Sequence, residues 1–111
     1  MEELVFPNEL FAPGHVVWNA LWIDPARTLA DQYMVLDEDL VHVQYRHNVT
    51  LDIGWYPALN PDGEFAVMVN DHPKWWKPFI ERRCRTIDEL RILVAEFIEI
   101  ARARSLSKKK K

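Results

Sequence analysis

Apolar and polar residues alternate strictly along two neighbouring stretches of this chain, and this alternation limits the fold more than any other feature. The first stretch covers residues 41–46 and the second covers residues 50–56, with a reversal at His47-Asn48 between them. Successive side chains of a β-strand point to opposite faces of the sheet, so the apolar members of both stretches share one face. The sequence therefore predicts an antiparallel hairpin with one buried face.

Two further strands are expected on either side of this hairpin. Residues 60–63 (NPDG) favour a type I turn, and alternation returns over residues 65–70. Residues 15–23 are rich in β-branched and aromatic side chains and predict another strand. The expected sheet is thus an antiparallel meander of three or more strands. Three tryptophans on these strands are expected in the core: Trp18, Trp22 and Trp55.

The segments before the hairpin predict smaller elements. Residues 1–14 carry two prolines and a glycine without a clear period, so we expect an irregular arm. Asp24-Pro25 resembles a helix start, which predicts a short helix over residues 25–33 and then a brief strand over residues 33–36.

The C-terminal third predicts an amphipathic helix. Thr86 and Glu89 have the spacing of a capping box, and apolar residues recur every three or four positions from Ile87 to Ala101. The expected fold is a single α+β domain over residues 1–104, with the helix packed on one face of the antiparallel sheet. Residues 105–111 (SLSKKKK) lack such spacing, and we expect a disordered basic tail.

Charge is divided unevenly along the 111 residues. Residues 1–73 contain 12 acidic residues against Arg27 and Arg46, a balance of −10, whereas residues 74–111 contain 12 basic residues against five acids, a balance of +7. These balances add up to the formal net charge of −3. An acidic body disfavours direct binding to nucleic acid and favours a basic partner.

Several classes of protein are disfavoured by the same inspection. No apolar run is long enough to cross a membrane, and the acidic N-terminus is unlike a secretory signal, so we expect a cytoplasmic protein. The single cysteine, Cys84, excludes a disulfide framework within the chain. Its basic neighbours would activate a thiol, but we favour a buried structural cysteine, because nothing nearby completes a Cys/His/Asp arrangement. We expect no catalytic residues, no metal and no cofactor.

The turns and the polar face of the hairpin carry most of the candidate binding residues. Their carboxylates would attract a basic protein, and aromatic residues would anchor it. Trp75 and Trp76 are adjacent in a proline-flanked segment, so at least one is a candidate anchor. The complete candidate set is Asp37, Glu38, Asp39, Asp52, Tyr56, Asp62, Glu64, Trp75 and Trp76.

Four segments together resemble small bacterial immunity proteins of contact-dependent growth inhibition systems. They are DLVHVQY at 39–45, LDIGWYP at 51–57, GEF at 63–65 and WKP at 76–78, and the likeness covers roughly residues 33 to 100. The resemblance implies a non-enzymatic cytoplasmic protein that binds and blocks the C-terminal toxin domain of a secreted effector, often a nuclease. It supplies no binding residues, so the interface is inferred from charge.

Two other functions remain open at this point. One is a small-ligand or enzymatic domain that uses His42, His47 and Asp52 with Tyr56 around a pocket. The other is a self-associating module that uses Trp75 and Trp76 in a homodimer.

Overall fold

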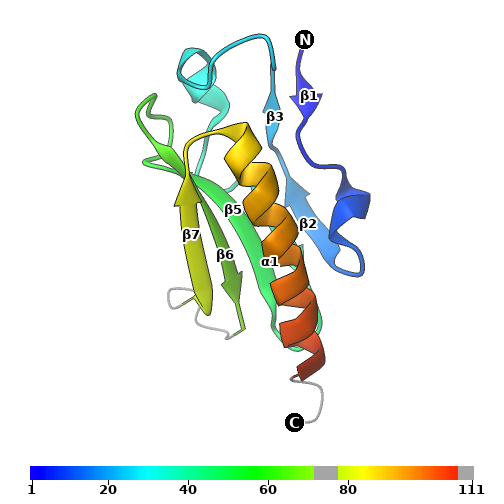
Figure 1. Cartoon of the computed structure of the whole chain (residues 1–111). Helices are drawn as coiled ribbons and strands as arrows, with labels where there is room; N and C mark the ends of the chain where they lie inside the picture. The colour runs from blue at the N-terminus through cyan, green and yellow to red at the C-terminus, as the bar shows by residue number, and fades with distance from the viewer. Residues whose placement is uncertain (72–77, 108–111) are drawn as a thin grey trace.

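The main sheet is antiparallel and has five strands in the order β2-β4-β5-β6-β7. The computed structural model describes residues 1–71 and 78–107, and in it helix α1 lies across one face of this sheet (Figure 1). The α+β class predicted from the sequence is confirmed. The bounds are β2 (His15–Asn19), β4 (Val41–Gln44), β5 (Thr50–Tyr56), β6 (Glu64–Asn70), β7 (Ile80–Cys84) and α1 (Ile87–Ser107).

The predicted hairpin and meander are confirmed with little shift in their bounds. β4 pairs with β5 from Val41 opposite Ile53 to Gln44 opposite Thr50, and β5 pairs with β6 along its whole length. The reversal between β4 and β5 has positive φ at His47 (64°) and Asn48 (65°), the left-handed conformation that tight hairpin turns require. Gly63 N–H donates to the Asn60 carbonyl at 3.1 Å, which closes the turn before β6.

The core lies between α1 and the sheet. The sheet contributes the alternate residues Leu51, Ile53, Trp55, Phe65, Val67 and Val69, all buried. The helix contributes a matching stripe, buried at three- and four-residue steps: Leu90, Val94, Phe97, Ile98 and Ala101. This interlocking buries the apolar face of every central strand and leaves the polar residues of the same strands on the other face.

The start of α1 confirms the predicted cap, and its end corrects the predicted boundary. Thr86 Oγ1 accepts from Glu89 N–H at 3.1 Å, while the Glu89 carboxylate accepts from Arg85 N–H at 3.1 Å. The helix runs to Ser107 instead of giving way to a tail at residue 105, because Ser105 is buried and its carbonyl contacts His47 Nδ1 at 2.9 Å. Residues 108–111 lie outside the described residues.

The N-terminal part departs most from expectation. The arm forms β1 (Glu3–Leu4) and the 3₁₀ helix η1 (Asn8–Phe11), and β1 pairs with β3 (Trp22–Ile23) in a separate two-stranded sheet. The strand expected over residues 15–23 is therefore two strands. The elements expected over residues 25–33 and 33–36 are wrong in bounds and kind, since the chain forms 3₁₀ structure, η2 (Ala30–Val35), which is kinked at Gln32.

Two tryptophans expected in the core are exposed, Trp18 by 53% and Trp22 by 46%, whereas Trp55 is buried as predicted. The physical reason for Trp18 is a shift of register between Val16 and Trp18, where β2 bulges against β4. A bulge adds one residue and turns the following side chain to the other face. Trp18 therefore lies on the face of the sheet opposite α1.

Candidate functional site

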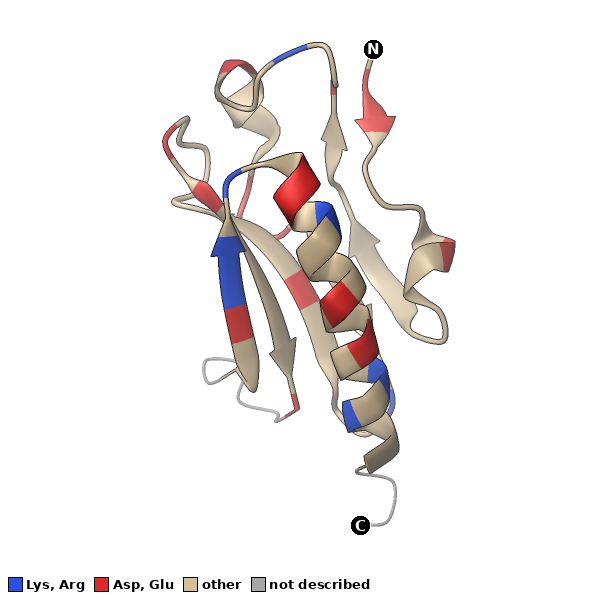
Figure 2. Ribbon diagram, in the orientation of Figure 1, with Lys and Arg blue, Asp and Glu red and all other residues tan. Residues whose placement is uncertain are grey.

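The face of the main sheet that α1 does not cover carries polar side chains from all five strands. We call it the open face. The pairing register places these residues on it: His15, Trp18, His42, Gln44, Thr50, Asp52, Tyr56, Glu64, Met68, Asn70, Glu81 and Arg83. Figure 2 shows the charges of these strands, with an acidic residue in the middle of β5 and basic residues on β7.

One row of directly opposed residues crosses the whole open face. It runs from Trp18 on β2 through His42, Asp52 and Met68 to Glu81 on β7. Directly opposed side chains in an antiparallel sheet lie about 5 Å apart at Cβ, so the members of the row are neighbours, and His42 contacts Asp52. The row brings an aromatic ring, an imidazole and a carboxylate together from three strands.

Asp52 is the centre of a hydrogen-bonded network. Its Oδ1 contacts His42 Nδ1, and its Oδ2 accepts from Thr50 Oγ1 at 3.2 Å and from Asn70 Nδ2 at 3.3 Å. A carboxylate only accepts hydrogen bonds, so the His42 nitrogen that faces it carries the proton. Three donors from three strands therefore hold this carboxylate in a fixed orientation.

The loop at residues 37–39 is held against the sheet at the edge of the open face. Trp55 N–H donates to the Asp37 carbonyl at 2.9 Å, and Trp18 Nε1 donates to the Asp39 carbonyl at 2.8 Å. The loop passes so close to β5 that a Cβ on Gly54 would lie 2.0 Å from the Glu38 carbonyl oxygen. Only glycine at this position allows the acidic loop to lie there.

The pKa of Tyr56 reflects the negative charge of this region. Burial raises the pKa of its phenol, and the negative charges of Glu38, Asp39 and Asp52 raise it further. Arg83 acts in the opposite direction and lies over the Tyr56 ring, 5.3 Å from its centroid. Three carboxylates from a loop and a strand thus act on one aromatic side chain.

These residues surround a hollow of about 1070 Å³ on the open face. Among the described residues that line it are three carboxylates, Glu38, Asp39 and Asp52, and no lysine or arginine. Trp18 and Tyr56 supply aromatic surface, and both His42 and His47 also line it.

The candidate residues from the sequence are thus partly brought together. Glu38, Asp39, Asp52 and Tyr56 line the hollow, and Glu64 lies beside it on β6, opposite Tyr56. Glu64 is paired with Arg83 at 3.4 Å and with Arg85 at 3.9 Å. The remaining candidates do not line the hollow. Asp37 lies in the 37–39 loop, Asp62 lies in the β5–β6 turn, and Trp75 and Trp76 lie outside the described residues.

Several residues of the site were missed as binding residues from the sequence, among them Trp18, Gln44, Thr50, Met68 and Asn70. Asn70 and Met68 share a face with Glu64 in the alternation of residues 64–70, so the period-2 pattern already pointed to them. Trp18 has no such signal, because a bulge that changes its face leaves no mark in the alternation. Of the four residues considered for a ligand pocket, all line the hollow: His42, His47, Asp52 and Tyr56.

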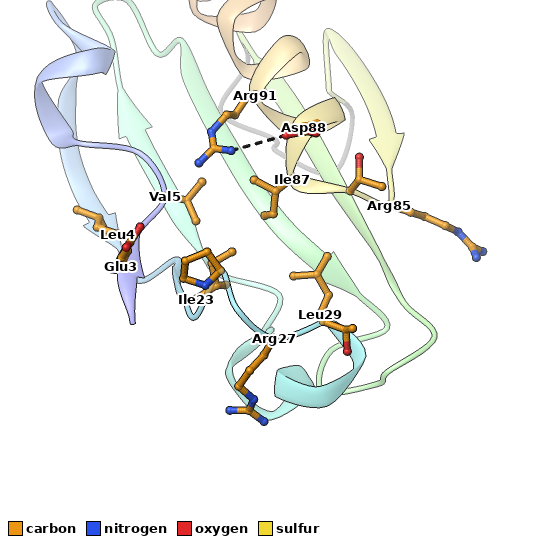
Figure 3. A pocket seen from close by; sticks show the side chains of 13 residues that line it. Glu3, Leu4, Val5, Ile23, Arg27, Leu29, Arg85, Ile87, Asp88 and Arg91 are labelled. Carbon is orange, nitrogen blue, oxygen red and sulfur yellow. Dashed lines mark ion pairs between the residues drawn. The ribbon is translucent and has the colours of Figure 1, made fainter. Parts of the chain in front are cut away.

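A second hollow, of about 490 Å³, lies between the N-terminal arm and the start of α1 (Figure 3). Its described lining combines apolar residues such as Val5, Leu29 and Ile87 with the charged residues Glu3, Arg27, Arg85, Asp88 and Arg91. Arg91 pairs with Asp88 at 3.9 Å, and Arg85 extends away from the hollow (Figure 3). This hollow therefore has a mixed lining that includes three arginines.

The described residues give little support to thiol chemistry or metal binding. Cys84 is buried as predicted, and burial raises the pKa of its thiol to about 11. In the described ranges, no group of three or more His, Cys, Asp or Glu side chains is arranged to hold a metal ion. Nor does that part of the chain contain a helix of sufficient length and hydropathy to span a membrane.

In comparisons with known proteins, no family model, no curated protein and no solved structure matches the chain.

Proposed function

We propose that this protein is a cytoplasmic immunity protein, which binds the basic toxin domain of a secreted effector and neutralises it. The observation that supports the proposal best is the hollow of the open face. Three carboxylates line it without any lysine or arginine among the described lining residues, and two aromatic side chains flank them. Such a surface suits a protein that carries basic side chains.

The proposed mechanism is occlusion and needs no catalysis by this chain. A nuclease domain binds a polyanion, so the approach to its active site is basic. The carboxylates of Glu38, Asp39 and Asp52 would occupy the positions of phosphates there, and their charge would speed the encounter. Trp18 and Tyr56 would contribute apolar contact area and slow dissociation.

The test uses the product of the open reading frame adjacent to the gene for this chain. Expressed alone it should arrest growth, and co-expression of this protein should restore growth. The double variant Glu38→Gln/Asp39→Asn should bind the toxin domain about tenfold more weakly, since removing two exposed interface charges loses about 1.4 kcal/mol.

A matched control removes two charges away from the open face. Glu9 lies on η1 and Glu96 lies on the exposed side of α1, and both are exposed. Glu9→Gln/Glu96→Gln should therefore bind as tightly as the unsubstituted protein. Absence of both toxicity and binding, or equal loss in the two double variants, would overturn the proposal.

A small-ligand site is the second candidate, because one observation favours it. His42, His47, Asp52 and Tyr56 line the same hollow, and the contact between His42 and Asp52 resembles a general base held by a carboxylate. An NMR screen of small polar fragments would test it. Saturable binding that shifts His42 and Tyr56 signals supports this function, and its absence contradicts it.

A further inference from the structure

A buried acceptor on the open face lacks a donor. Asn70, at the end of β6, is 3% exposed and lines the hollow. Its Nδ2 donates to Asp52 Oδ2, and within the described part of the chain its Oδ1 receives no hydrogen bond. The orientation of the amide follows from chemistry, because only its nitrogen can face a carboxylate.

An unpaired buried acceptor of this kind destabilises the fold. Groups of this kind are rare in native structures, and each needs an explanation, such as a partner that arrives from outside. Asn70 Oδ1 is itself buried, but Asn70 lines the larger of the two hollows, so a shift of its side chain would bring this oxygen within reach of a donor that enters the hollow.

A second acceptor lies next to it. Asp52 Oδ2 already accepts two hydrogen bonds, whereas Asp52 Oδ1 has the single contact with His42. Each carboxylate oxygen accepts about two, so Oδ1 retains one free position. Asn70 lies opposite Thr50, two residues from Asp52 along β5, which makes Asn70 and Asp52 diagonal neighbours on one face.

We propose that Asn70 and Asp52 form a subsite for the guanidinium group of an arginine side chain. The subsite rests on the proposed function, because the arginine belongs to the basic partner. Asn70 Oδ1 and Asp52 Oδ1 accept its N–H groups.

Arginine suits this position better than lysine because of the shape of its charged group. This planar group presents five N–H donors in a fixed fork and is weakly hydrated, so it satisfies several acceptors with a small loss of hydration.

The chain's own arginine on this face is already engaged elsewhere. Arg83 pairs with Glu81 at 2.9 Å and with Glu64 at 3.4 Å, and it lies over Tyr56. Within the described residues, no arginine of this chain lines the Asn70 end of the hollow.

An NMR titration of the full chain tests the subsite without the toxin. The probes are three blocked tripeptides, Gly-Arg-Gly, Gly-Lys-Gly and Gly-citrulline-Gly, the last being nearly isosteric with the first and uncharged. The arginine peptide should shift the side-chain amide of Asn70, with affinity about threefold or more above the lysine peptide. Equal binding of the citrulline peptide, or shifts confined to other residues, would overturn the subsite.

Substitution adds an independent readout. Asn70→Leu keeps the branched shape of the side chain and removes both polar atoms, and it should weaken binding of the arginine peptide about fivefold or more, whereas Glu96→Gln should leave this binding unchanged. If Asn70→Leu does not fold, the citrulline comparison on the unsubstituted protein decides. If the protein protects growth but does not bind the arginine peptide, the subsite is wrong and the proposed function stands. If it binds the arginine peptide but does not protect growth, the proposed function alone is wrong.

Discussion

Gly54→Ala tests whether close packing holds the acidic 37–39 loop in place. The new Cβ would lie 2.0 Å from the carbonyl oxygen of Glu38 and 3.0 Å from its carbonyl carbon. Both are backbone atoms, so no side-chain rotation relieves the overlap and the loop has to move. Movement would break the 2.9 Å hydrogen bond from Trp55 N–H to the Asp37 carbonyl.

The expected loss of stability follows from three contributions. The hydrogen bond contributes about 1 kcal/mol, and overpacking against backbone costs about 1–3 kcal/mol. The smaller backbone entropy of alanine in the unfolded chain offsets about 0.5–1 kcal/mol. We expect a net loss of about 2 kcal/mol in the free energy of unfolding, which corresponds to a fall of about 8 °C in Tm.

Urea unfolding followed by tryptophan fluorescence measures this loss. Ala66→Gly is the matched control, because Ala66 lies directly opposite Gly54 on β6 and this change removes a methyl group instead of adding one. Gly54→Ala should also lose toxin affinity, because Glu38 and Asp39 move, while Ala66→Gly keeps it. An unchanged or increased stability of Gly54→Ala would refute the reasoning, since strand preference alone favours alanine.

Three further predictions concern the helix start, the thiol and the buried tyrosine. Thr86→Ala should lower the free energy of unfolding in urea by about 1 kcal/mol through loss of the N-cap, and Ser107→Ala at the other helix end should change it by less than about 0.5 kcal/mol. Because burial raises the pKa of Cys84 from 9.0 to about 11, its thiol should react with a disulfide reagent at pH 8 about 100-fold more slowly in the native protein than in urea, and equal rates would contradict its burial. Burial also raises the pKa of Tyr45 from 10.0 to about 12, so the unfolded chain ionises first and stability should fall as pH rises from about 10 to 12. Denaturation at several alkaline pH values should show a shallower fall for Tyr45→Phe, and an identical fall would exclude this cause.

The sheet centre and the helix were predictable because local chemistry and tertiary packing agree there. Alternation over residues 41–56 matches the burial of one face, and Thr86 with Glu89 marks the helix start in both sequence and structure. The same pattern predicts two of the residues that line the hollow, Asp52 and Tyr56, because they lie on the polar side of that alternation.

The remaining features depend on pairing between distant segments. β7 has the sequence IERRC, where two arginines and a glutamate hide the strand pattern, and it forms because it pairs with the edge of β6. Trp18 reaches the open face through a bulge against β4, and the loop at 37–39 reaches it because Gly54 leaves space. Local sequence preferences do not encode such long-range contacts.

The affinity of the purified toxin domain for two double variants tests the central claim most directly. Both variants remove two negative charges, Glu38→Gln/Asp39→Asn at the hollow and Glu9→Gln/Glu96→Gln away from it. The account predicts that the first binds about tenfold more weakly at physiological salt, with a weaker dependence on salt, and that the second binds like the unsubstituted protein. Equal affinities and equal salt dependence for both variants would contradict it.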